Sequence, residues 1–546
     1  MKKINQIICI LAILFVSACN DVLDMKPLDK LSENDVWNDQ ALIQLYVNTV
    51  YRGSLPSGFQ GDLLSSACDE AYCIHNSGNF RLILRGELSP DNVNDLSWTL
   101  NYWKTAYSRI RDINIFFDRI SDAPVDEEFR KMATGEMTFL RAFVYANLIA
   151  RYGGVPIINT IYELNQDYAI SRDSYEECVS YIIAELDKAI PLLPDKQPES
   201  QLGRASADAC RALKSRVLLY AASPLVNATN DRARWQAAAS AAGELLNTRY
   251  ALEGDYRQTF LRDNGEIIFA RSYSQGQDNT TDFHLYQGRN GSNGWGAENP
   301  VQGLVDAFET VSGEMPRLDN GEVNPASGYD PLHPYENRDP RLSASILYDG
   351  AVWAGRETET WRGGLDSPES SVQSWNASLS GYYFRKFLHE DIPPSGGSVR
   401  PTSPWIFFRY AEILLNYAEA MFELGDEETA REYLNLVRSR AGVNMPPIPA
   451  TVAGEALRKR IHNERRVELV FEGHRFFDVR RWKIAMETEN VDQRGVDIRI
   501  VDGVKTYDFN RAVLQRRFSE QHYWIPIPRA EIDKSLGSLT QSPLYN

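Results

Sequence analysis

The sequence has few of the residues that build metal centres and disulfide frameworks. Its 546 residues include six cysteines and seven histidines. A structural zinc site needs about four closely spaced Cys or His ligands, whereas the one close pair, Cys68 and Cys73, has neither a second pair nor a His cluster beside it. That pair could form a disulfide outside the cytoplasm. Cys178 and Cys210 are isolated, as is typical of buried thiols. We therefore expect no metal and no cofactor.

Positive charge and long hydrophobic runs are also scarce. The chain has 58 Lys and Arg against 74 Asp and Glu, a formal net charge of −16. Because phosphates repel an acidic chain, this balance argues against nucleic acid and against adhesion to anionic lipid. No apolar run reaches the roughly 18–20 residues that a membrane-spanning helix needs. Any attachment to a membrane must therefore use another device.

Known catalytic motifs are missing as well. The sequence contains no HExxH, no GxSxG and no P-loop. Carboxylates are too numerous in an acidic chain to mark a glycosidase pair, whose two carboxyl groups lie about 5 Å apart in retaining enzymes. We predict no catalytic residue and no enzyme activity, and a surface glycoside hydrolase is the least favoured alternative.

The N-terminus has the pattern of a bacterial lipoprotein signal. Two lysines precede a short apolar run from Ile7 to Val16, and a small residue then stands directly before Cys19. We predict that residues 1–18 are a signal peptide and that Cys19 carries lipid, each buried methylene of which contributes about 0.8 kcal/mol to membrane binding. The polar, acidic residues 19–36 are the predicted tether. The alternative is an ordinary signal peptide with a chance cysteine.

The rest of the chain is dominated by helical periodicity. Apolar residues recur every three or four positions, and Ser174 with Glu177 forms a capping box. The predicted helical segments are 103–117, 136–152, 174–193, 206–224, 235–246, 409–425 and 427–442. The last two match half of a tetratricopeptide consensus, in which small residues let paired helices approach closely. We expect three or four such pairs stacked as a partial solenoid, with a generic helical bundle as the alternative.

Amino-acid composition and helical periodicity divide the mature chain into three parts. Residues 37–250 form an N-terminal helical part, and residues 409–546 form a C-terminal one. Residues 251–408 are rich in Gly, Pro and Trp and lack long periodic helices, although 266–270 could be a short strand. Loops of this length inside a compact protein tend to be functional, so we predict that this insertion carries the ligand face.

Sugar recognition needs flat aromatic rings for the apolar face of a pyranose and polar side chains for its hydroxyl groups. Candidates are loop tryptophans with polar neighbours, and Trp353 and Trp375 lie in such loops. The predicted ligand-binding residues are Trp98, Asn101, Arg81, Asn79, Trp295 and Trp361. For each tryptophan, burial in a local core is the alternative.

A dense charged stretch spans residues 464–482. Glu464, Glu468 and Glu472 share one helical face and are surrounded by arginines. Because the guanidinium fork matches a carboxylate well, we interpret this stretch as a structural ion-pair network rather than a catalytic site.

A family resemblance is carried by short blocks spread over the mature chain. They include FLRA and RYGGVP in 139–156, RDPRL in 338–342, RYAE in 409–412, the charged stretch 464–482 and WIPIP in 524–528. Further blocks lie at 203–220, 299–308 and 541–545, where Ser542 stands in place of the usual Asn. Together they resemble the SusD-like (RagB/SusD) nutrient-uptake outer-membrane lipoproteins of Bacteroidetes.

The resemblance implies both a fold and a function. The fold would be mainly α, with four tetratricopeptide-like helix pairs as a scaffold and a loop-rich irregular subdomain. The protein would be lipid-anchored at the cell outer membrane, exposed at the surface, and would capture oligosaccharides for a SusC-like TonB-dependent transporter. The alternative is a tetratricopeptide-type adaptor that scaffolds a surface complex without binding sugar. Ligand contacts in the family lie in variable loops, so the candidate sugar residues rest on chemistry alone.

Overall fold

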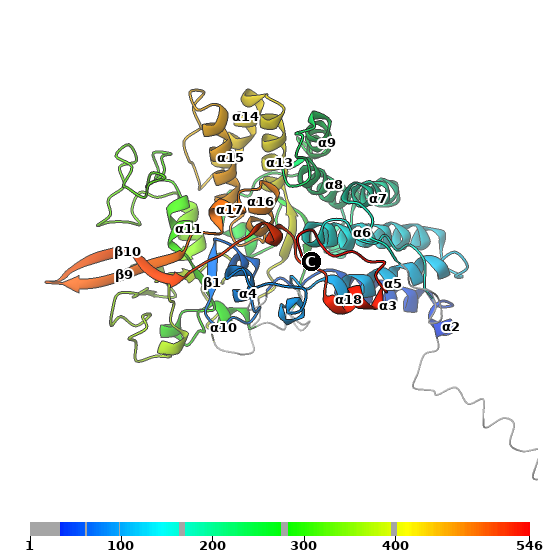
Figure 1. Cartoon of the computed structure of the whole chain (residues 1–546), viewed down its shortest axis with the longest axis horizontal. Coiled ribbons are helices and arrows are strands. Elements are labelled where there is room, and N and C mark those ends of the chain that lie inside the picture. The colour runs from blue at the N-terminus through cyan, green and yellow to red at the C-terminus, as the bar shows by residue number, and fades with distance from the viewer. Residues whose placement is uncertain are drawn as a thin grey trace, which may run out of the picture.

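The structure is a computed structural model that describes residues 33–59, 63–97, 99–162, 170–274, 282–394 and 401–545. It is mainly helical, as predicted, with strands arranged in antiparallel pairs (Figure 1). The helices are α2 (Glu33–Val36), α3 (Gln40–Ser54), α4 (Arg81–Leu84), α5 (Trp103–Arg119), α6 (Glu127–Tyr152), α7 (Tyr175–Ala189), α8 (Ala207–Ala222), α9 (Arg232–Gly243), α10 (Phe283–Gln287), α11 (Gln302–Ala307), α12 (Pro340–Ser345), α13 (Tyr410–Glu423), α14 (Glu427–Arg438), α15 (Gly454–Glu468), α16 (Arg475–Arg481), α17 (Ala485–Thr488) and α18 (Arg529–Lys534). The strands are β1 (Ala71–Cys73), β2 (Ile267–Arg271), β3 (Glu298–Pro300), β4 (Ile346–Leu347), β5 (Val352–Trp353), β6 (Arg356–Glu357), β7 (Tyr383–Phe384), β8 (Trp405–Arg409), β9 (Gln493–Val501) and β10 (Val504–Leu514).

The long helices form the scaffold, and consecutive helices pack against one another. α6 packs on α7, α8 on α9 and α13 on α14, and α9 also packs on α13 (Figure 1). The capping box of Ser174 and Glu177 is present and starts α7. These contacts agree with the expected stack of helix pairs.

The helix α6 is longer than predicted and ends where predicted. It begins at Glu127 because Asp126 adopts the extended conformation of an N-cap and acidic Glu127 and Glu128 favour the positive end of the helix dipole. It ends at Gly153, whose φ of 76° continues the chain in a conformation that glycine adopts without steric cost.

The segment between the scaffold helices packs into a second core, which it shares with residues from the N-terminal and C-terminal parts of the chain. Strand β2 confirms the predicted short strand and pairs with β8, and further pairs are β4–β7 and β5–β6. Large apolar side chains, among them Phe308, Phe384 and Phe387, form a second buried cluster beside the helical one. The ribbon of β9 and β10 projects from this end of the molecule (Figure 1).

The charged stretch of 464–482 is the predicted structural network, and it is buried. The Glu468 carboxylate lies 2.7 Å from a guanidinium nitrogen of Arg409, 2.7 Å from one of Arg440 and 2.9 Å from one of Arg341. Burial alone would raise the pKa of Glu468, but these three guanidinium groups hold it well below its usual range. The network joins α15 to α12 and β8, so it connects the loop-rich segment to the C-terminal helices.

The cysteines are buried thiols. Cys68 donates to the Ser65 carbonyl and the Cys73 sulfur lies 3.7 Å from Ser77 Oγ, so the possible Cys68–Cys73 disulfide is not formed. Cys178 and Cys210 are buried, as predicted.

The structure describes only the end of the predicted tether. Cys19 lies outside the described residues, whereas α2 lies inside the predicted tether, and its Val36 packs against the helical core. Across the described parts of the chain, no helix is both long and apolar enough to cross a membrane.

Candidate functional site

An open cleft of about 710 Å³ lies in the loop-rich part of the molecule. Two of its side chains are tryptophans with large exposed surfaces: 77% of Trp375 and 39% of Trp295 are accessible to solvent. The cleft is lined by His75, Ser77, Tyr286, Trp295, Ala297, Gln373, Trp375 and Asn376. We call this set the aromatic cleft.

The first wall is positioned by a short ladder. Strands β1 and β3 pair antiparallel with Cys73 opposite Glu298, and the Ile74 amide continues the ladder by donating to the Ala297 carbonyl at 3.1 Å. This pairing brings His75 beside Trp295. Their side chains meet edge to face at 6.1 Å between ring centroids, and His75 Nε2 lies 2.8 Å from the Trp295 carbonyl oxygen.

The second wall combines α10 with the turn that carries Trp295. The Trp295 amide donates to the Leu285 carbonyl at 2.7 Å, which places the indole 5.0 Å from the ring of Tyr286. Gly296 has a φ of +50°, and a Cβ there would lie 2.5 Å from the Asn376 carbonyl oxygen. The turn therefore needs glycine to approach the opposite loop.

The third wall is the loop that presents Trp375. Gln373 adopts the left-handed conformation, and its side chain accepts from Asn376 Nδ2 at 2.8 Å. Asn290, fully buried on the Trp295 side, donates to the Val372 carbonyl at 2.8 Å. The loop is thus tied both to itself and to the wall that carries Trp295.

The cleft is lined by aromatic and polar side chains. The eight lining residues include no Asp, Glu, Lys or Arg. Indole and phenol rings offer flat apolar faces, while serine and amide groups offer hydrogen bonds. In the described ranges of the chain, no group of three or more His, Cys, Asp or Glu side chains is arranged to hold a metal ion. The cleft is built to bind a ligand that has both apolar faces and polar edges.

The predicted ligand residues are distributed unevenly around this cleft. Trp295 lines it directly. Asn79 and Arg81 support the loop of His75, since Asn79 accepts from Asn76 and Arg81 donates to the Ile74 carbonyl at 2.9 Å.

Two further predicted residues, Asn101 and Trp361, do not line the cleft. Asn101 donates to Asn94, and Trp361 packs against the second core. Trp98 lies outside the described residues.

Sequence reasoning left out most of the lining residues. Trp375 was one of several loop tryptophans, and its exposure sets it apart from Trp353, which is 8% exposed. His75 lies in the same loop as the predicted Asn79, which was an available signal. Nothing in the sequence marks Tyr286, because its place depends on the contact of α10 with the Trp295 turn.

Two sequence profiles of known protein families match this chain. The sequence profile of the SusD family matches residues 265–545. The chain belongs to the SusD family. A second profile, described as starch-binding associating with outer membrane, matches residues 21–219 of this SusD-family chain. The two matches together include most of the helical parts and most of the loop-rich segment, and residues 220–264 lie between them.

Relatives of this SusD-family chain are similar over most of their length. The SusD-like protein P2 of Formosa agariphila is 24% identical and aligns over 100% of both chains. The starch-binding protein SusD of Bacteroides thetaiotaomicron is 23% identical, covering 78% of this chain and 81% of that one.

Solved structures agree with the fold. A SusD-like protein of Bacteroides fragilis has a TM-score of 0.81 at 30% identity, with 95% of this chain and 100% of that one covered. A SusD-like carbohydrate-binding protein of the same species has a TM-score of 0.76 at 26% identity, covering 91% and 99%.

Proposed function

We propose that this SusD-family protein is a lipid-anchored glycan-binding protein of the outer membrane. It captures oligosaccharides in the aromatic cleft and delivers them to a SusC-like TonB-dependent transporter. Cys19 carries the lipid, and the protein performs no catalysis. The family supports carbohydrate binding, because relatives are described as a starch-binding protein and a carbohydrate-binding protein.

One observation carries the ligand class: the cleft exposes two tryptophans beside Tyr286 and His75. A tryptophan that is 77% exposed loses the hydrophobic stabilisation that burial would supply. Covering it with the apolar face of a sugar ring recovers part of that stabilisation, while Ser77, Gln373 and Asn376 lie within the same cleft for the hydroxyl groups.

The charges favour a neutral glycan over an acidic one. No arginine or lysine lines the cleft to pair with a uronate or a sulfate. The chain as a whole has a formal charge of −16, so an acidic polysaccharide is repelled at long range. The proposed ligand is therefore a neutral oligosaccharide.

The test is titration of the purified soluble protein with a panel of neutral and acidic oligosaccharides. For a bound neutral oligosaccharide, Trp375→Ala and Trp295→Ala should each lower affinity at least about tenfold, which corresponds to about 1.4 kcal/mol. Trp361→Ala removes a tryptophan outside the cleft and is the matched control, since it should change stability rather than affinity.

Two results would overturn the capture of glycans in the aromatic cleft. One is the absence of binding to every glycan of the panel, accompanied by co-purification of a protein partner, which would favour the adaptor alternative. The other is normal binding by both cleft variants, which would place the glycan elsewhere on the molecule. Release of reducing sugar by the wild-type protein would contradict the absence of catalysis.

A further inference from the structure

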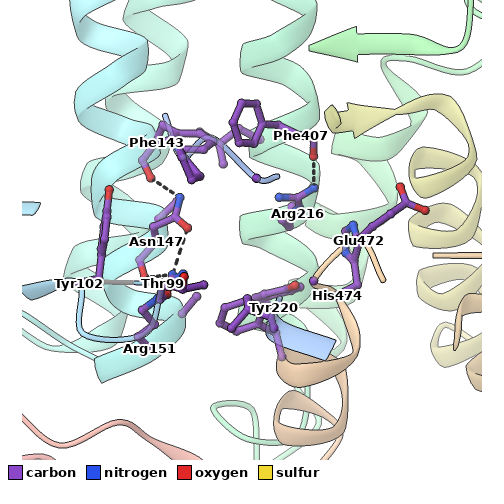
Figure 2. A pocket seen from close by; sticks show the side chains of 18 of the residues that line it. Thr99, Tyr102, Phe143, Asn147, Arg151, Arg216, Tyr220, Phe407, Glu472 and His474 are labelled. Carbon is purple, nitrogen blue, oxygen red and sulfur yellow. Dashed lines mark hydrogen bonds between the residues drawn. The ribbon is translucent and has the colours of Figure 1, made fainter. Parts of the chain in front are cut away.

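A second cavity lies in the helical part of the molecule and shares no lining residue with the aromatic cleft. Its volume is about 160 Å³, close to that of an engineered protein cavity of about 150 Å³ that binds benzene. Figure 2 shows Tyr102, Asn147 and Arg151 on one side and Arg216 and Tyr220 on the other. The space between α6 and α8 therefore accommodates one ring-sized group.

The walls are mostly aromatic and aliphatic. The rings of Tyr102, Phe143, Tyr220, Phe407 and Phe477 contribute to them, and Ala146 and Ala150 leave room along α6. Asn147, Ala150 and Tyr220 are only partly buried, so the cavity reaches the surface. Such walls bind a flat ring through apolar contact and ring packing.

Most charged groups at this cavity are already neutralised by protein partners. Arg216 forms an ion pair with Glu412 at 2.7 Å and donates to the Phe407 carbonyl (Figure 2). Glu472 accepts from Lys386 and Arg409 at 2.8 and 2.6 Å. A ligand cannot gain much from either group, because each is satisfied internally.

Arg151 is different, because no carboxylate among the described residues pairs with its charge. It is 7% exposed and donates to the Thr99 carbonyl and to Asn147, which are neutral acceptors. Within the described ranges, no carboxylate forms an ion pair with it. Its guanidinium carbon lies 5.1 Å from the ring centroid of Tyr102 and 5.3 Å from that of Phe477. Burial lowers the pKa of Arg151, although an arginine side chain stays protonated in proteins.

We propose that this cavity binds a small aromatic carboxylate. The ring occupies the space between α6 and α8, and the carboxylate accepts a hydrogen bond from the one Arg151 N–H, on Nη2, that has no acceptor among the described residues. Bringing a carboxylate to a buried cation without a counter-ion forms a charge-assisted pair where none exists. The negative charge of the ligand is what distinguishes this site from the aromatic cleft, which offers no cation.

The experiment titrates the intact soluble protein with benzoate and with benzyl alcohol, its neutral counterpart, by calorimetry. Saturable benzoate binding at least about tenfold tighter than benzyl alcohol is expected. Ala150→Phe fills the cavity and should abolish benzoate binding, while glycan binding at the aromatic cleft stays unchanged. Ala146→Leu is a second filling variant in case the first fails to fold.

The outcomes separate this site from the proposed function. Trp375→Ala should leave benzoate binding unchanged whether or not a glycan is found. Absence of benzoate binding at about 1 mM would overturn the proposal and leave water as the occupant. Equal affinity for benzyl alcohol, or benzoate binding that survives both filling variants, would also overturn it.

Discussion

The side-chain amide of Asn290 donates to the backbone carbonyl of Val372 at 2.8 Å, and this bond links the two loops that carry the exposed tryptophans. Asn290 precedes Trp295 in one loop, and Val372 precedes Trp375 in the other. The Tyr383 hydroxyl donates to Asn290 Oδ1 and fixes the orientation of its amide. The separation of the two indoles is therefore set by a buried hydrogen-bonded asparagine.

Removing this asparagine should loosen the cleft. We expect Asn290→Ala to cost about 1–3 kcal/mol of stability, since it removes the donor to the part-buried Val372 carbonyl and one of the acceptors of the buried Tyr383 hydroxyl, which keeps its bond to the Asp366 carbonyl. Affinity for a neutral oligosaccharide should fall several-fold because the Trp375 loop loses its fixed position. Denaturant unfolding and calorimetry measure the two effects.

The matched control for this variant is Asn227→Ala. Asn227 is also buried, and its amide donates to the Ala222 carbonyl within the helical scaffold. The Asn227→Ala variant should be less stable but should keep its affinity for the oligosaccharide. Equal losses of affinity in both variants would show that Asn290 acts through general stability alone.

The buried ion-pair network should be sensitive to the loss of one cation. Arg409 contacts three carboxylates, those of Glu266, Glu468 and Glu472. Arg409→Met leaves them under-compensated in the interior, so we expect a loss of about 3–5 kcal/mol in the free energy of unfolding. Urea unfolding of wild type and Arg409→Met measures this loss.

A surface pair provides the comparison for the Arg409 variant. Arg499 lies 3.0 Å from Asp497, but its side chain is 58% exposed. Arg499→Met should cost no more than about 1 kcal/mol. A cost of similar size for the two variants would contradict the view that burial makes the Arg409 network sensitive.

Glu70 should make the protein less stable as pH rises. Both of its carboxyl oxygens are buried and have no hydrogen-bond partner among the described residues. Burial, and secondarily the charge of Asp69, raises the pKa of Glu70 to about 8. Since the folded-state pKa is above the unfolded one, its contribution is fully present below about pH 4.5 and is lost as pH rises through about 8.

The variant Glu70→Gln removes this dependence. It should be more stable than wild type at about pH 8, by roughly 1.4 kcal/mol for each unit of pKa shift, and the difference should vanish at about pH 4. Chemical unfolding over this pH range tests it. A difference in stability that stays constant with pH would show that folding does not shift the pKa of Glu70.

Removal of the proposed lipidation site should change where the protein is found in the cell, but it should not change glycan binding. In the proposed function, Cys19→Ala prevents lipidation, so the protein should be released from the outer membrane as a folded, ligand-competent chain. Fractionation of cells followed by glycan titration of the released protein measures both properties. Retention of the variant at the membrane would show that Cys19 is not the anchor.

The features of this protein that depend on local order can be predicted from its amino-acid sequence. Periodicity and capping predicted the helices α5 to α9, α13 and α14, because the contacts that select a helix lie within one or two turns. The density of Arg and Glu in residues 464–482 predicted the ion-pair network, since burial of so many charges requires mutual pairing. Trp295 was identified because flexible Gly and Asn neighbours are unusual around a core tryptophan.

The side chains of the aromatic cleft come together through contacts between distant parts of the chain, so the sequence does not predict this set. His75 and Trp295 meet although they are 220 residues apart in the chain, because β1 pairs with β3. Trp375 joins them through the Asn290–Val372 bond, whereas Trp361, equally plausible in sequence, packs against the second core. Exposure of a loop tryptophan depends on long-range pairing and packing, which local sequence does not encode.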